Sequence, residues 1–207
     1  MITPARRGLC LVIASPSGGG KTAIARRLVA TEESLTLSIS MTTRDPRSSE
    51  QDGVDYLFRA QVDFDAMVTA GGFLEYAQVF ARSYGTPRAP VAAALPLGQD
   101  MVFDIDWQGH RSLRAALPGD VVGVFLMPPS LRALEDRLTK RGDGAAAVAS
   151  RMARARDEIS HWAEFDHVVI NEDFDSAVEQ VRAILHAARL DTARQHGLAD
   201  FVAGLDD

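Results

Sequence analysis

The sequence predicts an α/β protein in which helices cover both faces of a wound parallel sheet. Three observations carry this prediction. Residues 8–14 form a wholly apolar run, which is typical of a strand buried on both faces. A glycine-rich turn and then a helical pattern follow this run directly. Beyond residue 97, short apolar runs alternate with helical patterns, as expected of βαβ units with parallel strands.

The core elements follow in chain order. The first predicted helix places Ile24, Leu28 and Val29 on one side. Strands are expected at residues 100–106 and 121–127, with a helix over 108–117 between them. The prolines at 128 and 129 then break the chain, and Ser130 is a candidate N-cap for a helix whose apolar side carries leucines at 131, 134 and 138.

Three more core elements complete the pattern. A long helix is expected over residues 146–164 and a strand over 167–170. The last helix, from 174 to about 189, places Ala177, Val178, Val181, Ile184 and Leu185 on one face. The tail, residues 191–207, carries Phe201, Val202 and Leu205, which are consistent either with a short packed helix or with a contact to a partner.

The middle of the chain, residues 38–96, has a different pattern. Short strand-like pieces at 37–40, 55–58 and 73–80 surround one short helix that carries Phe64, Met67 and Val68. This pattern predicts an α+β subdomain inserted into the α/β core. One domain of 207 residues is therefore expected, with the core formed by 1–37, 97–136 and 152–190, and with a small mobile segment at 137–151.

Composition excludes several classes of protein. Hydrophobic residues make up 46% and charged residues 24%, as in globular domains, and no apolar run approaches the roughly 20 residues needed to span a bilayer. Cys10 is the single cysteine, so a disulfide framework is excluded. A net charge of −6 argues against binding to nucleic acid or to an anionic membrane. No signal peptide is recognised, and a cytoplasmic location is expected.

The loop after the first strand carries the strongest chemical signal. Its sequence is Ser15-Pro16-Ser17-Gly18-Gly19-Gly20-Lys21-Thr22. In such a loop, backbone N–H groups converge on phosphate oxygens at the positive end of a helix, the lysine reaches the β/γ-phosphates, and the threonine hydroxyl holds Mg²⁺. Of the 22 cationic residues only Lys21 and Lys140 are lysines, so a lysine at this position is notable. The loop predicts binding of ATP or GTP.

A phosphate-binding loop does not by itself choose between a GTPase, an ATPase and a small-molecule kinase. Residues 106–109, Asp-Trp-Gln-Gly, fit the Asp-x-x-Gly pattern of GTPases. The Asn-Lys-x-Asp stretch that reads guanine in GTPases is missing, and Asn171-Glu172-Asp173 is the nearest approach to it. A GTPase is therefore disfavoured.

The phosphate-binding loop and the motifs after it resemble guanylate kinases, P-loop enzymes that phosphorylate GMP with ATP. The motifs, in the family's order, are residues 40–47 (Ser-Met-Thr-Thr-Arg-Asp-Pro-Arg), 53–56 (Gly-Val-Asp-Tyr), 73–77 (Phe-Leu-Glu-Tyr-Ala), 84–86 (Tyr-Gly-Thr), 104–109 (Asp-Ile-Asp-Trp-Gln-Gly) and 169–173 (Val-Ile-Asn-Glu-Asp). The resemblance spans residues 8–188. It implies that the insert at 38–96 binds GMP and that 137–151 is a lid.

The resemblance also implies roles for individual residues in holding GMP. Arg44 and Arg47 would clamp its phosphate, since guanidinium groups match phosphate oxygens. Tyr56 and Tyr84 would add hydroxyl donors. Glu75, assisted by Asp106, would accept hydrogen bonds from the guanine N1–H and amino group, and the Ser40 and Thr86 hydroxyls would serve O6. A base that left such polar groups unpaired would be rejected by a factor of about 10⁴ or more.

For phosphoryl transfer, the family implies cations around the transferring group. Lys21, Arg44, Mg²⁺ and the lid arginines Arg137, Arg141 and Arg151 would provide them. Asp104 is a candidate to orient Mg²⁺ through water, and Asn171 a candidate to contact adenine. The segment from Arg141 to Arg151 is one residue shorter than usual in the family, which leaves the register of Arg151 open.

Each of these residue types also has a simpler interpretation. Asp106 could cap the helix that follows it. Glu75 and the tyrosines could be ordinary residues of a half-buried sheet, and the lid arginines could lie on a solvated helix face or pair at i,i+4, as Arg154 with Glu158. The tryptophans and the five histidines have no metal-ligand spacing and fit core or surface positions.

Three functions remain in competition. The leading hypothesis is an ATP:GMP phosphotransferase. A guanylate-kinase-like interaction module would keep the fold, but such modules typically lose the phosphate loop that Lys21 and Thr22 represent here. A kinase with another phosphorylated acceptor is the third, and Glu75 with Asp106 favours guanine over it. The choice between GMP and dGMP and the oligomeric state stay open.

Overall fold

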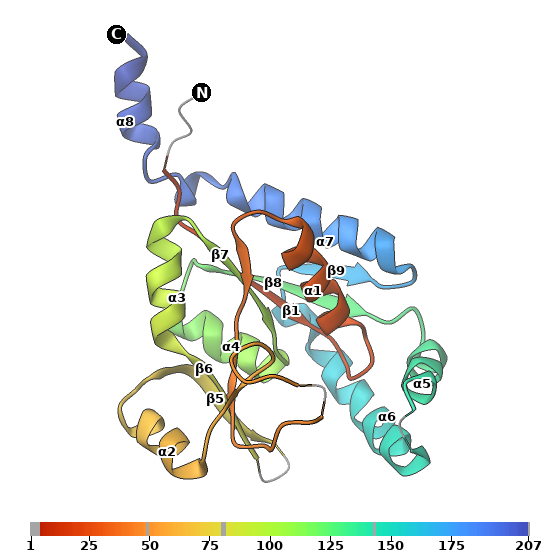
Figure 1. Cartoon of the computed structure of the whole chain (residues 1–207). Helices are drawn as coiled ribbons and strands as arrows, with labels where there is room; N and C mark the ends of the chain where they lie inside the picture. Colours follow the sequence, from red (N-terminus) through yellow and green to blue (C-terminus); the bar gives the residue numbers. More distant parts are fainter. Residues whose placement is uncertain (1–4, 49, 80–81, 143, 207) are drawn as a thin grey trace.

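The computed structural model describes residues 5–48, 50–79, 82–142 and 144–206, and its centre is a five-stranded sheet. The strands are β1 (Cys10–Ala14), β2 (Leu35–Leu37), β7 (Asp100–Asp104), β8 (Val121–Met127) and β9 (His167–Ile170), in the order β2-β7-β1-β8-β9 (Figure 1). Every neighbouring pair is parallel. The predicted α/β class and the wound parallel sheet are confirmed.

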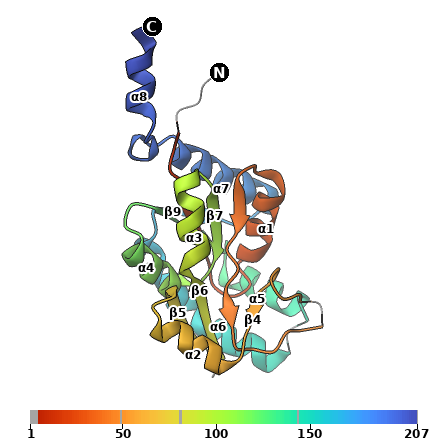
Figure 2. The ribbon, with the colours of Figure 1, turned by 60° about the vertical axis from the view of Figure 1, so that its left-hand side comes forward.

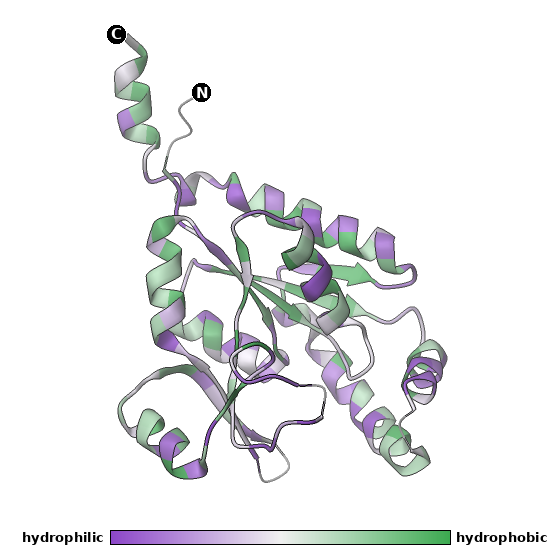
Figure 3. Cartoon of the chain, in the orientation of Figure 1, coloured by the Kyte–Doolittle hydropathy of each residue, from purple (hydrophilic) through white to green (hydrophobic). Residues whose placement is uncertain are grey.

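Both faces of this sheet are covered, which explains the apolar run of β1. Leu11 and Ile13 face helices α1 (Lys21–Thr31) and α7 (Phe174–Arg189). Cys10 and Val12 face the opposite layer, which includes α3 (Arg88–Ala94) and α4 (Trp107–Ala116). Figure 2 shows the sheet between these layers, and Figure 3 shows apolar strands between helices striped with polar residues. Parallel strands with helices on both sides need apolar residues on both faces.

A second, four-stranded sheet lies beside the first. It contains β3 (Met41–Thr42), β4 (Leu57–Phe58), β5 (Phe73–Val79) and β6 (Arg82–Pro87) in the order β4-β3-β6-β5. Helix α2 (Gln61–Thr69) packs on it through a small core of Met41, Phe64 and Phe73, with the two phenylalanine rings stacked 4.6 Å apart. The predicted strand at 73–80 is observed as β5, with residue 80 outside the described residues.

Two expectations for this region were wrong in detail. The strand predicted at 37–40 is observed at Leu35–Leu37, and it belongs to the central sheet because it pairs with β7. The strand predicted at 55–58 is reduced to Leu57–Phe58, since the backbone N–H of Asp55 donates to the Gln51 carbonyl in a turn and is not available to a neighbouring strand.

Helices α5 (Leu131–Lys140) and α6 (Ala145–Ser160) follow β8. Ser130 caps α5 as predicted, because its hydroxyl accepts a hydrogen bond from the Ala133 N–H at 3.0 Å. The long helix predicted over 146–164 ends earlier, at Ser160, and continues as the 3₁₀ turn η2 (His161–Glu164).

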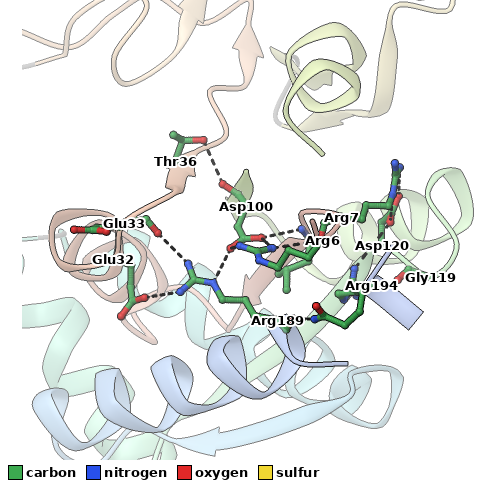
Figure 4. Close-up of polar contacts among 12 residues, drawn as sticks. Arg6, Arg7, Glu32, Glu33, Thr36, Asp100, Gly119, Asp120, Arg189 and Arg194 are labelled. Carbon is green, nitrogen blue, oxygen red and sulfur yellow. Dashed lines mark hydrogen bonds and ion pairs between the residues drawn. The ribbon is translucent and has the colours of Figure 1, made fainter. Parts of the chain in front are cut away.

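Buried ion pairs at the amino ends of the central strands join the two ends of the chain (Figure 4). The Asp100 side chain is fully buried and accepts two hydrogen bonds from Arg6, at 2.8 and 2.9 Å, and one from Arg189, at 2.7 Å. Arg7 donates two more, at 2.8 and 2.7 Å, to Asp120. Segments far apart in the sequence are therefore fastened at the end of the sheet where the central strands begin.

The remaining elements are the 3₁₀ turns η1 (Leu95–Leu97), η3 (Thr192–Arg194) and η4 (Gly204–Asp206) and the helix α8 (Leu198–Ala203), which projects from the body (Figures 1 and 2). The tail thus forms a short helix, although Val202 and Leu205 are exposed. Within the described ranges, none of the helices combines the length and the apolar character that crossing a membrane requires.

Candidate functional site

The phosphate loop connects the carboxyl end of β1 to α1, as predicted. Gly20 has a φ of 100°, a conformation that favours glycine, and a Cβ at this position would lie 2.6 Å from the amide nitrogen of Asn171. That amide in turn donates a hydrogen bond of 2.8 Å to the Gly19 carbonyl. Asn171 is buried, and its hydrogen bond to the Gly19 carbonyl holds the loop backbone in place. The adenine contact expected of Asn171 stays a prediction.

Lys21 and Thr22, at the start of α1, lie against Asp104 at the carboxyl end of β7. The Thr22 hydroxyl donates a hydrogen bond to Asp104 Oδ2, and Lys21 Nζ lies 3.9 Å from Asp104 Oδ1. This Oδ1 atom is buried and accepts no hydrogen bond from the described part of the chain. A hydroxyl and a carboxylate are the oxygen ligands that Mg²⁺ takes when phosphates and waters complete its shell.

Thr22 and Asp104 can be compared with the other metal ligands that the described residues provide. No group of three or more histidine, cysteine or acidic side chains in the described residues is arranged to hold a metal ion. Mg²⁺ bound with a nucleotide needs only one or two protein ligands, so Thr22 and Asp104 are sufficient for it.

Arg44 and Arg47 lie in the loop after β3, together with the acidic residue Glu50. Arg44 Nη2 donates to Glu50 Oε1 at 2.9 Å, and the Arg47 N–H donates to Glu50 Oε2 at 2.8 Å. The hydrogen bond between the two side chains raises the pKa of Arg44 and lowers that of Glu50. Glu50 was not predicted as a site residue, because its one signal in the sequence was its position three residues after Arg47.

Two tyrosines complete this group of residues. The Arg44 guanidinium lies 5.4 Å from the centre of the Tyr56 ring, and the Tyr56 and Tyr84 rings meet edge to face at 6.1 Å. Burial raises the pKa of Tyr56, so its hydroxyl stays a proton donor. A cavity of about 460 Å³ opens here, and Thr22, Asp104, Ser40, Arg47, Glu50 and Tyr56 are among its lining residues.

A second cavity, of about 190 Å³, adjoins the first and reaches under β5 and β6. Glu75, Asp106, Ser40, Tyr84, Lys21 and Asp104 are among its lining residues. The buried Thr86 hydroxyl donates a hydrogen bond of 2.6 Å to Glu75 Oε1. Burial raises the pKa of Glu75, and the charge of Asp106 raises it further, although the hydrogen bond from Thr86 lowers it.

Asp106 is a helix N-cap, which is one of the two roles considered for it from the sequence. It caps α4, because its Oδ1 accepts a hydrogen bond of 2.9 Å from the Gly109 N–H. The same side chain lines the smaller cavity, so the two interpretations of Asp106 are compatible.

The three lid arginines lie around the phosphate loop. Arg137 and Arg141 line a cavity of about 270 Å³ over the loop, and Arg137 Nη2 donates to the Asn171 carbonyl at 2.7 Å. Arg151 Nη1 donates to the Ser17 hydroxyl at 2.8 Å, so Arg151 reaches the phosphate loop, while its correspondence to the family's lid arginine stays a prediction. Glu158, expected from its spacing only as a partner of Arg154, accepts a hydrogen bond from the backbone N–H of Ser17 in this loop. All the site residues predicted from the sequence therefore line these connected cavities or pack against them.

Comparisons with known proteins agree on one family. A family model described as guanylate kinase matches residues 7–188. The chain is 58% identical over 200 residues to a guanylate kinase of Granulibacter bethesdensis, covering 97% of this chain and 94% of the relative. It is 59% identical over 199 residues to one of Gluconobacter oxydans, covering 96% of each. The crystal structure of a guanylate kinase from Anaplasma phagocytophilum is similar with a TM-score of 0.83 and 32% identity, over 99% of this chain and 98% of that one.

Proposed function

The chain belongs to the guanylate kinase family, and from this premise we propose how its residues carry out the family's reaction. The protein is an enzyme that phosphorylates GMP to GDP with ATP as the donor. One observation carries the assignment of residues. Three neighbouring residues link the cavity over the phosphate loop to the two cavities beside the smaller sheet, because Lys21, Thr22 and Asp104 each line two of the three. Donor and acceptor phosphates placed in them would meet at these three residues.

The larger cavity would hold the GMP phosphate. Arg44 and Arg47 would bind its oxygens, with hydroxyl donors from Tyr56 and Tyr84. Glu50 already holds the Arg44 guanidinium and the Arg47 backbone in one arrangement before substrate arrives. A preorganised clamp lowers the entropy that binding must overcome.

The smaller cavity would hold guanine. Glu75 would accept hydrogen bonds from the N1–H and the amino group, with help from Asp106, while the Ser40 hydroxyl would donate to O6. The Thr86 hydroxyl has one proton, which it donates to Glu75, so it would serve O6 by turning that proton from Glu75 to the base. Adenine presents an acceptor at N1, so it would leave the Glu75 carboxylate unpaired in a buried site. The same contacts are available to dGMP, because none of these residues is assigned to the ribose, and we therefore expect dGMP to be a substrate.

The loop from Ser15 to Thr22 would bind the ATP phosphates through backbone N–H groups, and Asn171 would contact adenine. Thr22 and, through water, Asp104 would hold Mg²⁺. Bound with ATP, the metal ion would neutralise charge on the β- and γ-phosphate oxygens. The Thr22 hydroxyl and the Asp104 carboxylate provide the oxygen atoms that such a metal ion would need.

In the transfer step, a phosphate oxygen of GMP attacks the γ-phosphorus of ATP. The bond from the γ-phosphorus to the bridging oxygen breaks, and ADP leaves with that electron pair. The chain contributes positioning and positive charge rather than covalent chemistry. Lys21 would act on the donor phosphates and Arg44 on the acceptor phosphate, and Arg137, Arg141 and Arg151 would add positive charge around the loop. A closed lid over residues 137–151 would keep water from taking the phosphoryl group.

The same proposal includes the division of the chain. Residues 38–96 would act as the GMP-binding insert, 137–151 as the lid and 191–207 as a tail, with the remainder as the core. A cytoplasmic location and the lack of a nucleic-acid or membrane partner also belong to it, and the net charge of −6 supports them.

The test is ADP release from Mg-ATP with GMP, dGMP, AMP, CMP or UMP as acceptor. We expect turnover with GMP and dGMP and at least about 10⁴-fold lower kcat/KM with AMP, the order reached by sites that hydrogen-bond a substrate group. Comparable rates with GMP and AMP would contradict the assignment of the smaller cavity to guanine. Activity with GMP and none with dGMP would overturn the expectation for the deoxynucleotide alone.

A further inference from the structure

One face of helix α6 is directed at the phosphate loop. Arg151, Ala155 and Glu158 are spaced at i, i+4 and i+7, so they lie on the same side of the helix. Ala155 is buried, with 1% of its surface exposed, and its small side chain allows the helix to approach its neighbours closely. Along the helix, Arg151 lies before Ala155 and Glu158 lies after it.

Both polar residues contact the same loop residue, Ser17. Arg151 Nη1 donates to the Ser17 hydroxyl at 2.8 Å, and the Ser17 backbone N–H donates to Glu158 Oε2 at 3.1 Å. One contact would let the helix rotate about that point. Two contacts about two helical turns apart fix both the distance and the rotation of α6 against the loop.

Glu158 has a charged environment that none of the proposed roles explains. It is half-buried, and Lys21 and Arg154 are close enough to favour its charged form, while Asp106 opposes it. Burial has the largest effect and raises the pKa of Glu158 above its ordinary value. The backbone N–H of Ser17 in the phosphate loop holds this half-buried carboxyl group in place.

We infer that Glu158 is a positioning residue, which keeps α6 against the phosphate loop so that Arg151 stays at the Ser17 hydroxyl. Glu158 itself touches no reacting atom. It acts through Arg151, and the inference therefore rests on the proposed role of Arg151 in phosphoryl transfer. Because the bond needs only an acceptor oxygen, glutamine can replace glutamate and alanine cannot.

The experiment is a double-mutant cycle with Arg151→Ala and Glu158→Ala, in which kcat and the KM of ATP and of GMP are measured. Glu158→Ala is expected to lower kcat about 10-fold, the order that follows from loss of one hydrogen bond to a charged group, with each KM changed less than about 3-fold. Glu158→Gln should retain at least about half of the wild-type kcat, since its amide oxygen still accepts from Ser17. Asp157→Ala is the matched control, because Asp157 is the exposed neighbour of Glu158 on the same helix.

The double variant decides the inference. If Glu158 acts through Arg151, then Arg151→Ala with Glu158→Ala has the kcat of Arg151→Ala alone. Losses that multiply would overturn the inference, as would a Glu158→Gln variant as slow as Glu158→Ala with an unchanged Tm. Should Glu158→Ala fail to fold, Glu158→Asp enters the cycle, because a side chain one methylene shorter does not reach Ser17 from the same backbone position.

The same data separate this inference from the proposed function. A normal kcat for Arg151→Ala would contradict the proposed role of Arg151 and the inference with it. A low kcat for Arg151→Ala together with a normal kcat for Glu158→Ala would overturn the inference alone.

Discussion

At the scale of single residues, Glu75 carries the proposed discrimination between guanine and adenine. A carboxylate offers acceptor oxygens to both the N1–H and the amino group of guanine, whereas a glutamine amide offers one acceptor and one donor. The Thr86 hydroxyl keeps one carboxylate oxygen oriented at 2.6 Å. Glu75→Gln is therefore expected to raise the KM for GMP about 10- to 100-fold, with less than about a 3-fold change in the KM for ATP.

Steady-state kinetics with each substrate varied in turn measure this difference. Glu33→Gln is the matched control, since Glu33 is exposed just after α1, and both KM values should stay at the wild-type level. If Glu75→Gln raised the two KM values equally, Glu75 would not be reading the base.

His110 makes stability, rather than catalysis, depend on pH. It is 1% exposed and stacks on Phe165 with ring centres 4.0 Å apart, and neither ring nitrogen has a hydrogen-bond partner in the described chain. Burial lowers its pKa to about 4, and the charge of Arg114 lowers it further. The folded protein therefore holds this imidazole neutral over a range in which an unfolded chain would protonate it.

The sign of the effect follows from this difference. Between pH 6.5, the ordinary value, and pH 4, the unfolded state binds a proton that the folded state does not. The free energy of unfolding thus falls as the pH drops through this window, by about 3 kcal/mol in total from this residue. Urea unfolding at pH 7.5 and pH 4.5 should show a smaller loss for His110→Phe than for wild type. His167→Gln, at an exposed position on β9, should behave as wild type; an identical loss in His110→Phe would contradict the argument.

At the scale of elements, Asp106 shows how one side chain serves both a helix and a site. It caps α4 through the Gly109 N–H and also lines the smaller cavity, which we propose binds guanine. Asparagine caps a helix about as well as aspartate but lacks the charge. Asp106→Asn is expected to leave Tm near the wild-type value and to raise the KM for GMP, whereas Asp106→Ala should also lose about 1 kcal/mol of stability.

Ser130→Ala provides the control for this separation. It removes the cap of α5 and should cost about 1 kcal/mol by denaturant unfolding, with the KM for GMP unchanged, because Ser130 is not among the lining residues of the proposed guanine cavity. A Tm for Asp106→Asn as low as that of Asp106→Ala would show that the charge, rather than the cap geometry, stabilises α4.

Elements with a single strong local signal were predicted well. Strands β8 and β9 and helix α7 have the predicted bounds, because apolar runs and one amphipathic face with the Asp173 cap are visible locally. Strand β6 was not predicted. Its sequence, Arg82 to Pro87, is mostly polar and contains glycine, and it becomes a strand by pairing with β5 on one side and β3 on the other.

In the candidate site too, local sequence patterns did not predict the contacts that depend on tertiary packing. The types of residue and their order indicated a phosphate loop, an arginine clamp and an acidic base reader. The sequence could not show that Glu50 holds Arg44, nor that Glu158 reaches Ser17, because the second contact spans 141 residues of chain. Contacts of this kind depend on the packing of whole elements, which local patterns do not contain.

At the scale of the whole molecule, strand β7 joins the buried ion pairs to the site. Asp100, at its amino end, accepts hydrogen bonds from Arg6, from Arg189 and from the Leu9 N–H, while Asp104, at its carboxyl end, faces Lys21 and Thr22. Four residues along a strand correspond to about 13 Å. The two carboxylates are therefore well separated: Asp100 fastens the fold, and Asp104 has its proposed role in the reaction.

Asp100→Asn tests this separation. The substitution leaves the guanidinium groups of Arg6 and Arg189 facing a neutral amide in a buried position, and breaking a buried pair in this way costs about 3–5 kcal/mol. We expect a loss of that size in denaturant unfolding, with both KM values near wild type at temperatures where the variant is folded. Asp175→Asn breaks an exposed pair with Arg27 and should change stability by less than about 1 kcal/mol. If Asp100→Asn and Asp175→Asn lowered the free energy of unfolding equally, the buried ion pairs would stabilise the fold no more than an exposed one. That result would contradict their role in fastening the chain ends.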